Sequence, residues 1–213
     1  MYSYVFFDLD GTLTDPAIGI TNAVMYALRH YGIEVADRST LYPFIGPPLT
    51  DSFENYFGFS KEKAVEAVEV YREYFSTKGI FENRVYDGVP AMLQVLCDSG
   101  VRAVLATSKP LVFADRILEH FGLKPYFYYT AGSELSGERV EKAAVIRYAL
   151  EKCRLSPADS VVMVGDRSYD VAGAAACGLP AIGVSYGYGS REELQDALYI
   201  ADSVEELQKI LLT

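Results

Sequence analysis

The sequence has few cysteines, and those it has are widely separated. Cys97, Cys153 and Cys177 form no CxxC pair. An odd number of cysteines without that spacing argues against a disulfide framework and against a zinc site. We therefore expect three reduced thiols buried in the core, as free cysteines usually are.

Long apolar segments are also absent. No run approaches the roughly 18 to 20 residues needed to cross a bilayer. The N-terminus has no basic segment before its first apolar residues, and no small-residue cleavage site follows them. These absences predict a cytoplasmic protein that has no membrane partner.

Basic residues are outnumbered by acidic ones, and the 213 residues carry a formal net charge of −10. Such a chain has no basic surplus to neutralise the backbone of DNA or RNA, so we expect no nucleic-acid polymer as a partner. A small phosphorylated metabolite is compatible with this charge, because one bound metal ion can reverse the local field. The sequence leaves the oligomeric state open between monomer and homodimer.

Strand-like and helix-like patterns alternate along most of the chain. The strand-like runs are β-branched or aromatic and nearly continuous, as in parallel strands buried on both faces. Helical spacing separates the later runs, most clearly at 142–153. This alternation indicates an α/β fold with a doubly wound, Rossmann-like parallel sheet. The five expected strands are 4–7, 101–106, 126–131, 161–164 and 181–185.

One segment of about seventy residues departs from the alternation, because it contains helical patterns only. It lies between the first expected strand and a helix expected at 89–98. An insert of this length is too long for a simple loop. We therefore expect two domains: an α/β core of residues 1–15 and 84–213, and an all-helical cap domain of residues 16–83.

Several local signals mark helix starts. Asp15 followed by Pro16 is typical of an N-cap with proline at the first helical position. The pairs Ser190 with Glu193 and Ser203 with Glu206 fit the capping-box pattern. Within the insert, Gly46-Pro47-Pro48 breaks the helical pattern, and further helices are expected near 50–57 and 60–76.

Polar residues follow three of the expected strands, and a lysine opens one of the expected helices. Ligand sites of open α/β sheets lie outside the carboxyl ends of the strands, so we expect these side chains to meet at one edge. The residues are Asp8 and Asp10 after the first strand, Thr107, Ser108 and Lys109 after the second, Asp166 and Asp170 after the fourth, and Lys142 at the helix start.

Clustered carboxylates repel one another and are costly to bury unless a cation holds them. An all-oxygen set suits a hard ion, and Mg²⁺ bound by a few carboxylates and a substrate phosphate fits best. The hydroxyls of Thr107 and Ser108 and the ammonium of Lys142 can then take the remaining phosphate oxygens.

Four of these segments resemble the signature motifs of the haloacid dehalogenase superfamily, in the same order. They are DLDGTLTD, ATSKP, the lysine of GERVEK, and VGDRSYD, and they bracket Asp8 to Asp170. The finer resemblance is to the phosphoglycolate phosphatase-like branch, whose helical cap follows the first motif. Within that branch FIGPPLTDSF, ATSKP, EKAAVIRYAL and YGYGSREEL look closest to the 5′-nucleotidase-like group.

The resemblance implies a role for each acid. Asp8 would be the nucleophile that forms an aspartyl-phosphate, and Asp10 would be the general acid and then the general base. Mg²⁺ would be bound by Asp8, by the backbone carbonyl of Asp10 and by Asp166. Asp170 would lie beside the ion and orient its ligands.

The same resemblance implies phosphate-binding groups. Thr107 would hold the phosphate together with the backbone of Leu9 and Ser108. Lys142 would neutralise charge on Asp8 and on the phosphoryl group. Lys109 is expected in the surroundings of the site, where three fates stay open: contact with the phosphate, a capping role, or exposure to solvent, which is the more common one for a lysine after a strand.

The leading hypothesis is therefore a Mg²⁺-dependent phosphomonoesterase that acts on a small metabolite, with a 5′-nucleotide preferred over 2-phosphoglycolate. A phosphosugar mutase of the same fold remains an alternative. Asp10 argues against dehalogenase chemistry, and the chain lacks the DKTGT motif of the ion-pumping relatives. A signalling receiver domain is disfavoured, because it would carry its phosphorylated aspartate after a middle strand, whereas the candidate nucleophile Asp8 follows the first strand. An inactive interaction protein is disfavoured because every acid is retained.

Overall fold

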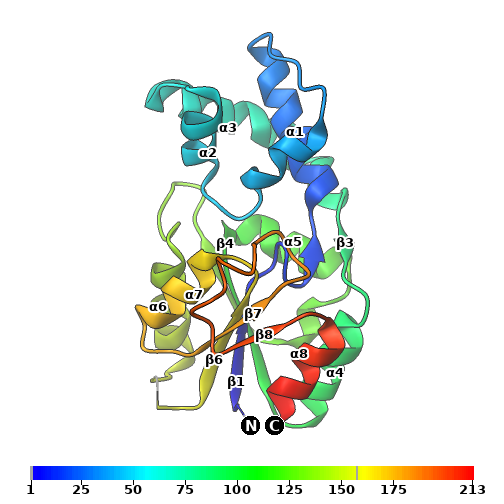
Figure 1. Cartoon of the computed structure of the whole chain (residues 1–213), viewed down its shortest axis with the longest axis vertical. Helices are drawn as coiled ribbons and strands as arrows, with labels where there is room; N and C mark the ends of the chain where they lie inside the picture. The colour runs from blue at the N-terminus through cyan, green and yellow to red at the C-terminus, as the bar shows by residue number, and fades with distance from the viewer. Residues whose placement is uncertain (1, 157) are drawn as a thin grey trace. The chain divides into compact units, whose positions relative to one another are not determined.

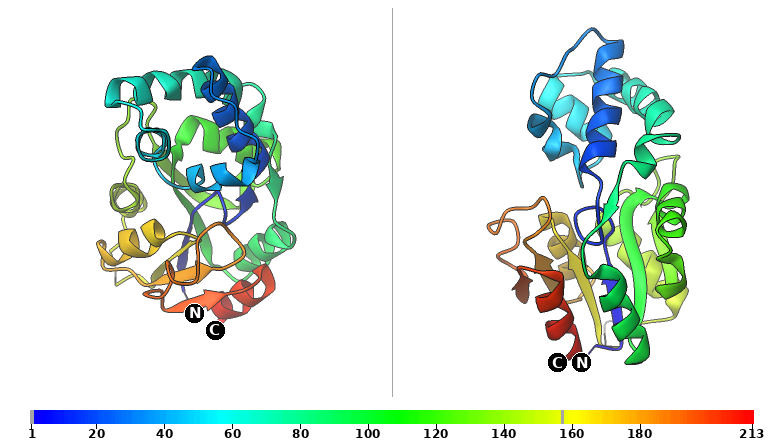
Figure 2. Two further views of the ribbon diagram at one scale, coloured as in Figure 1. Left: turned by 45° about the horizontal axis from the view of Figure 1, so that its top comes forward. Right: turned by 90° about the vertical axis from the view of Figure 1, so that its right-hand side faces the viewer.

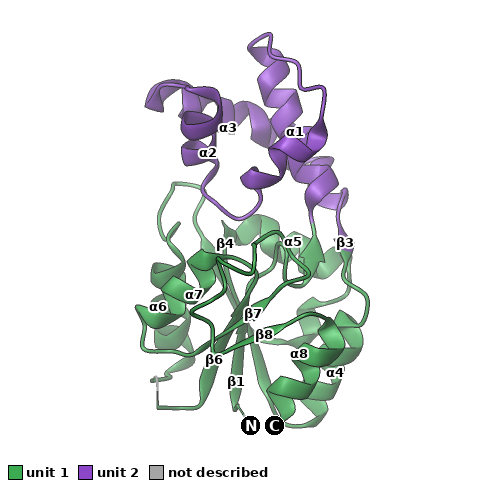
Figure 3. Cartoon of the chain, viewed as in Figure 1, with its two compact units in different colours: residues 1–15, 85–213 green, residues 16–84 purple. Residues whose placement is uncertain are grey.

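The computed structural model describes residues 2–156 and 158–213. The chain divides into two compact units (Figure 3). One contains the residues up to Asp15 together with Val85–Thr213, and the other, which we call the helical unit, is Pro16–Arg84. The second division lies one residue beyond the expected boundary, inside the short strand β3 (Arg84–Val85), which pairs with β2 (Thr14–Asp15).

The first unit is built on a six-stranded sheet in the order β5-β4-β1-β6-β7-β8, in which every described pairing is parallel (Figure 1). The five expected strands are confirmed, with ends shifted by a few residues. A sixth strand, β8, was not predicted, because three residues are too few to show a pattern. The strands are β1 (Tyr4–Phe7), β4 (Arg102–Pro110), β5 (Phe127–Ser133), β6 (Val161–Gly165), β7 (Ala181–Val184) and β8 (Tyr199–Ala201).

Strand β1 lies between β4 and β6 in the interior of the sheet (Figure 2). Phe7, its last residue, is in register with Leu105 of β4 and with Val164 of β6. The residues that follow these three positions therefore emerge at the same edge. The strand order also reverses direction beside β1, which is the kind of position where doubly wound sheets bind ligands.

Helices cover both sides of this sheet (Figure 1). Helix α6 packs against α7, and α4 packs against α8. The predicted apolar face of α6 is buried in one core cluster with residues of β1 and β6, such as Phe6 and Met163. The helices of this unit are α4 (Val89–Asp98), α5 (Leu111–His120), the 3-10 helix η3 (Lys124–Tyr126), α6 (Lys142–Cys153), α7 (Ser168–Ala175) and α8 (Val204–Leu212).

The helical unit has an aromatic core of its own. Phe53 is fully buried, and its ring lies 5.1 Å from that of Phe44 and 5.8 Å from that of Phe59, measured between centroids. Helix α1 lies so close to η2 that a Cβ added to Gly19 would be 1.9 Å from the carbonyl oxygen of Gly79. The elements are α1 (Ala17–His30), η1 (Arg38–Phe44), α2 (Leu49–Phe57), α3 (Lys61–Phe75) and η2 (Gly79–Phe81).

One expected helix cap, at Asp15, and one expected helix start, at Ser190, are wrong. Asp15 does not cap α1; the residue at the cap position is Pro16, and the Asp15 carboxylate accepts a hydrogen bond from the hydroxyl of Tyr188. Ser190 and Glu193 exchange the hydrogen bonds of a capping box, but turns follow instead of a helix. The other carboxylate oxygen of Glu193 is bonded to Arg167, which ties this segment to the loop after β6.

The start at Ser203 is confirmed, since its hydroxyl accepts the amide of Glu206 at the beginning of α8. All three cysteines are free, as expected, but only Cys153 is buried: Cys177 is half-buried and Cys97 is exposed, so the expectation of three core thiols is wrong for Cys97. Among the described residues, no helix has the length and the apolar character that a membrane span requires.

Candidate active site

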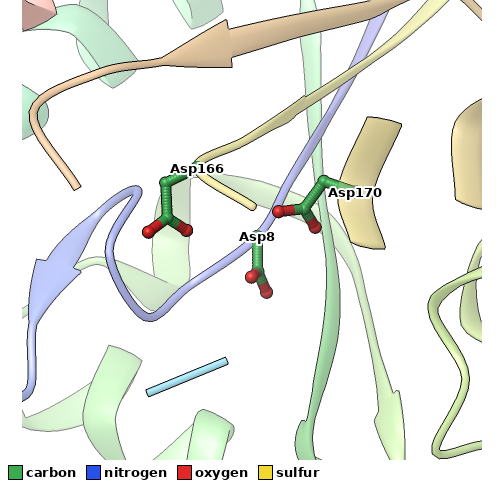
Figure 4. Close-up of side chains that lie close together, drawn as sticks. All are labelled: Asp8, Asp166 and Asp170. Atoms are coloured by element: carbon green, nitrogen blue, oxygen red, sulfur yellow. The ribbon is translucent and has the colours of Figure 1, made fainter. Parts of the chain in front are cut away.

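Three carboxylates meet at the sheet edge predicted from the strand ends. Asp8 directly follows β1, Asp166 directly follows β6, and Asp170 lies in the first turn of α7. Carboxylate oxygens from the three residues lie within 4.8 Å of one another (Figure 4). Their exposed fractions are 6%, 0% and 1%, so the cluster is almost completely removed from water.

Lys142, the first residue of α6, joins two of these acids. Its Nζ lies 2.8 Å from Oδ1 of Asp8 and 2.8 Å from Oδ1 of Asp170. It also donates a hydrogen bond of 3.1 Å to the carbonyl oxygen of Ala106. Burial by itself lowers the pKa of Lys142, but the attraction of Asp170 and Asp8 outweighs it and raises that pKa. The lysine therefore stays protonated at neutral pH.

One ammonium cannot balance three buried carboxylates. Burial, followed by repulsion from Asp170, raises the pKa of Asp166 to about 8. Burial also raises the pKa of Asp170 to about 6, although Lys142 opposes the shift. A divalent cation would remove this penalty, and carboxylate oxygens are the donors that hard ions such as Mg²⁺ prefer. The residues therefore fit a divalent metal.

Asp10 has a lysine of its own. Nζ of Lys109 contacts Oδ2 of Asp10, and the two side chains are only 7% and 11% exposed. Oδ1 of Asp10 is buried and accepts no hydrogen bond from the described part of the chain. Burial raises the pKa of Asp10, although Lys109 opposes the shift. The fates expected from the sequence for Lys109 were phosphate, a cap or solvent; its side chain is instead largely buried and paired with Asp10. The pairing was missed because β1 and β4 meet only in the folded sheet.

A tight turn begins at Leu9, which lies between Asp8 and Asp10 in the sequence. The carbonyl of Leu9 accepts the amides of Leu13 and Thr14 at 2.9 and 3.0 Å, and Gly11 has a φ of +79°. A Cβ at Gly11 would lie 2.1 Å from Oδ2 of Asp166. Glycine is thus required both by the backbone conformation and by the close approach to the carboxylate cluster.

The two hydroxyl residues of ATSKP lie in β4, where its pairing with β5 is irregular. Ala106 is paired with Ala131 and Pro110 with Ser133, so the intervening stretch of β4 is longer than that of β5. Oγ1 of Thr107 accepts the amide of Lys109 at 3.3 Å, which leaves the hydroxyl hydrogen available to an acceptor such as phosphate. The carbonyl of Ser108 accepts the hydroxyl of Ser133 at 2.8 Å.

Sequence reasoning missed the role of the segment Tyr186–Gly189, which follows β7. The amide of Tyr188 donates a hydrogen bond of 2.7 Å to Oδ2 of Asp166. A Cβ on Gly187 would lie 2.4 Å from Cβ of Asp166, and a Cβ on Gly189 would lie 1.9 Å from its carbonyl oxygen. Two glycines alternating with tyrosines at the end of a strand were the available signal of this close packing.

Comparison with known proteins agrees with this geometry. Residues 5–184 match the model of the haloacid dehalogenase-like hydrolases. A 5′-nucleotidase from Pseudomonas aeruginosa is 46% identical over 204 residues, which cover 94% of this chain and 92% of that protein. The tyrosine-protein kinase PtkA from Mycobacterium tuberculosis is 39% identical over 211 residues, which cover 97% of this chain and 72% of that protein.

A solved structure matches the fold of the whole chain. The crystal structure of a predicted phosphatase from Clostridium acetobutylicum has a TM-score of 0.96 and 52% sequence identity, and the match covers 100% of this chain and 99% of that one. The chain has the doubly wound α/β fold and belongs to the haloacid dehalogenase-like hydrolase family. It is thus an enzyme of the hydrolase class, as the motifs predicted.

Proposed function

We propose that this protein is a Mg²⁺-dependent phosphomonoesterase that works through an aspartyl-phosphate on Asp8. The observation that carries the proposal is a cluster of three carboxylates, those of Asp8, Asp166 and Asp170. The ammonium of Lys142 contacts two of them, Asp8 and Asp170. The phosphatases among its relatives support the reaction class.

The metal site would use the acids that the cluster collects. The carboxylates of Asp8 and Asp166, with the backbone carbonyl of Asp10, would hold Mg²⁺, and Asp170 would lie beside it. When bound, the ion neutralises the carboxylates and draws electron density from the phosphoryl group.

In the first step, a carboxylate oxygen of Asp8 attacks the phosphorus atom of the substrate. A bond forms between that oxygen and phosphorus, and the bond from phosphorus to the ester oxygen breaks. Lys142 offsets the negative charge of Asp8, which lets a carboxylate approach an anionic phosphate. Asp10 gives its proton to the departing ester oxygen.

In the second step, water attacks the phosphorus of the aspartyl-phosphate. Asp10, now ionised, takes a proton from that water, and the bond between phosphorus and Asp8 breaks to release inorganic phosphate. The raised pKa of Asp10 supports this pair of roles, because the group must carry a proton in one step and lack it in the next.

The phosphate itself would be held at the ends of β1 and β4. The hydroxyl of Thr107, whose oxygen already accepts the Lys109 amide, would donate to one phosphate oxygen. The backbone N–H groups of Leu9 and Ser108 would take others. Fixed donors of this kind stabilise the charge that develops in phosphoryl transfer.

A 5′-nucleotide is the preferred substrate. The Pseudomonas relative named as a 5′-nucleotidase matches almost the whole of both chains, and the segments FIGPPLTDSF and YGYGSREEL resemble the same group.

The test is phosphate release by the purified protein from a panel of phosphomonoesters, in Mg²⁺ and in EDTA. The panel contains 5′-nucleotides, 2-phosphoglycolate and sugar phosphates. Mg²⁺-dependent release led by nucleotides is expected. If 2-phosphoglycolate released phosphate fastest, the proposed reaction would stand and the proposed substrate would change. If sugar phosphates were isomerised without release of phosphate, the protein would be a mutase. Transfer from ATP to protein tyrosine without release to water would contradict the hydrolase proposal.

A further inference from the structure

The two acids of the first motif are held by lysines from different elements. Asp8 is paired with Lys142 at the start of α6, and Asp10 is paired with Lys109 at the end of β4. A buried ammonium is costly unless it is paired, and the Lys109 side chain, 7% exposed, contacts the Asp10 carboxylate. The two lysines therefore serve different carboxylates.

The backbone that carries Lys109 is fixed from two sides. Its amide donates to Oγ1 of Thr107 at 3.3 Å, and the preceding carbonyl, that of Ser108, accepts the hydroxyl of Ser133 at 2.8 Å. The neighbouring strand approaches so closely that a Cβ on Gly132 would lie 2.8 Å from the Lys109 carbonyl oxygen. The lysine therefore projects toward Asp10 from a rigid base, as the irregular end of a strand beside an active site often does.

The two oxygens of Asp10 are not equivalent in this arrangement. Oδ2 contacts the Lys109 ammonium. Oδ1 is buried and accepts no hydrogen bond from the residues that the structure describes. When one oxygen of a carboxylate is held by a partner, its second oxygen points in a fixed direction. Proton transfer to a departing oxygen requires such a fixed direction.

We propose that Lys109 is a positioning residue that holds Asp10 by Oδ2, so that Oδ1 exchanges the proton with the leaving group and then with water. This inference rests on the proposed phosphatase function. In the first step the proton passes from Oδ1 of Asp10 to the ester oxygen as its bond to phosphorus breaks. In the second step the proton of the attacking water passes to Oδ1.

A direct role of Lys109 in phosphate binding makes a different prediction. A lysine that bound phosphate would affect every phosphomonoester alike, because all of them carry the same phosphoryl group. A lysine that positions the acid affects esters in proportion to their need for a proton. An alkyl phosphate needs protonation of its leaving oxygen, whereas 4-nitrophenolate leaves without it.

The experiment compares Lys109→Met with the parent protein in rapid-mixing kinetics with Mg²⁺. The measured quantity is the rate of the first release of leaving group from 4-nitrophenyl phosphate, phenyl phosphate and an alkyl phosphate. We expect the loss in Lys109→Met to exceed about 10²-fold for the alkyl ester, and to be at least about tenfold smaller for the 4-nitrophenyl ester. In Lys109→Met, the steady-state rate of turnover of the 4-nitrophenyl ester should then be lower than the rate of the first release of 4-nitrophenolate. The reason is that Asp10 is also needed as the base in the second step. Lys109→Arg should recover part of the alkyl rate.

Lys124→Met is the matched control, since it removes another lysine–aspartate pair from the same unit, that with Asp115. It should leave the leaving-group dependence unchanged. Thermal unfolding of each variant separates loss of structure from loss of rate. Equal losses in Lys109→Met for all three esters would overturn the inference while the phosphatase function stands. Absence of release by the parent protein from any ester would overturn the proposed function and the inference with it.

Discussion

The amide nitrogen of Tyr188 lies 2.7 Å from Oδ2 of Asp166, to which it donates a hydrogen bond across 22 residues of sequence. The contact holds Asp166, the most buried acid of the cluster. Because the donor is the backbone amide, no side-chain substitution at Tyr188 removes it. Its geometry depends instead on the two glycines on either side of Tyr188, which let the backbone pass close to Asp166.

Gly189→Ala should therefore weaken metal binding. The added Cβ would meet the backbone carbonyl of Asp166 at 1.9 Å, so the segment or the acid must move. Displacing a group that supports a metal ligand typically costs about 10- to 100-fold in metal affinity or activity. A titration with Mg²⁺ followed by calorimetry, together with the rate of phosphate release, measures both effects.

Gly100→Ala is a suitable control for that variant. Gly100 has a φ of +79° and no atom within 4 Å of an added Cβ. Alanine there should lower the free energy of unfolding by about 1 kcal/mol through backbone strain alone and should leave Mg²⁺ affinity unchanged. Equal Mg²⁺ affinity in both variants and the parent protein would contradict the role given to Gly189.

The acid cluster predicts that stability of the metal-free protein depends on pH. The pKa of Asp166 is raised from 3.8 in the unfolded chain to about 8, and that of Asp170 to about 6. The folded protein therefore binds protons that the unfolded chain has already released, so its stability falls as pH rises from about 4 to about 8. Thermal unfolding in EDTA should show a lower midpoint at pH 8 than at pH 6.

Mg²⁺ should weaken this dependence, because the ion replaces the protons as the partner of the carboxylates. The midpoint should rise with Mg²⁺, and more so at pH 8 than at pH 6. Asp166→Asn should reduce both the pH dependence in EDTA and the gain from Mg²⁺. A midpoint in EDTA that is the same at both pH values would argue against the buried, mutually repelling acids.

Lys142 is expected to contribute to stability and to rate by separable routes. Lys142→Met leaves Asp8 and Asp170 without their shared ammonium, and breaking a buried pair costs roughly 3–5 kcal/mol. Loss of a group that offsets charge at the phosphoryl centre should lower kcat by about 10²- to 10³-fold. Urea unfolding in EDTA and steady-state kinetics in Mg²⁺ measure the two effects.

A second substitution separates them. The double variant Lys142→Met with Asp170→Asn removes one of the uncompensated charges, so it should regain part of the lost stability and none of the lost kcat. If stability and kcat recovered together, the lysine would act on catalysis only by maintaining the fold.

Much of the fold could be predicted from local pattern. Helix α6 begins and ends where its apolar periodicity predicted, because one face of Lys142–Cys153 is buried along its whole length. The strand ends predicted the meeting of Asp8 with Asp166, since parallel strands expose their carboxyl ends together. Strand β8 was missed because its three residues have mixed burial and no periodicity.

The contacts that sequence could not supply are those between distant segments. Lys109 and Asp10 are 99 residues apart, and nothing near either residue identifies the other as its partner. Ser190 and Glu193 form the predicted local hydrogen bonds, yet Glu193 is also bonded to Arg167 and Ser168, and no helix follows. Local rules predict local bonds; the competing long-range bonds appear only in the folded chain.

Asp8 should become phosphorylated during turnover, and acid-quenched peptide mass spectrometry detects that phosphoryl group. The Asp10→Asn variant is mixed with 4-nitrophenyl phosphate and Mg²⁺, because that ester needs no acid to leave while the loss of the base slows hydrolysis of the intermediate. One phosphoryl group is expected on the peptide that contains Asp8, and none is expected in the double variant that carries both Asp8→Asn and Asp10→Asn. A phosphoryl group on another residue, or sustained phosphate release by Asp8→Asn, would contradict the assignment of Asp8 as the nucleophile.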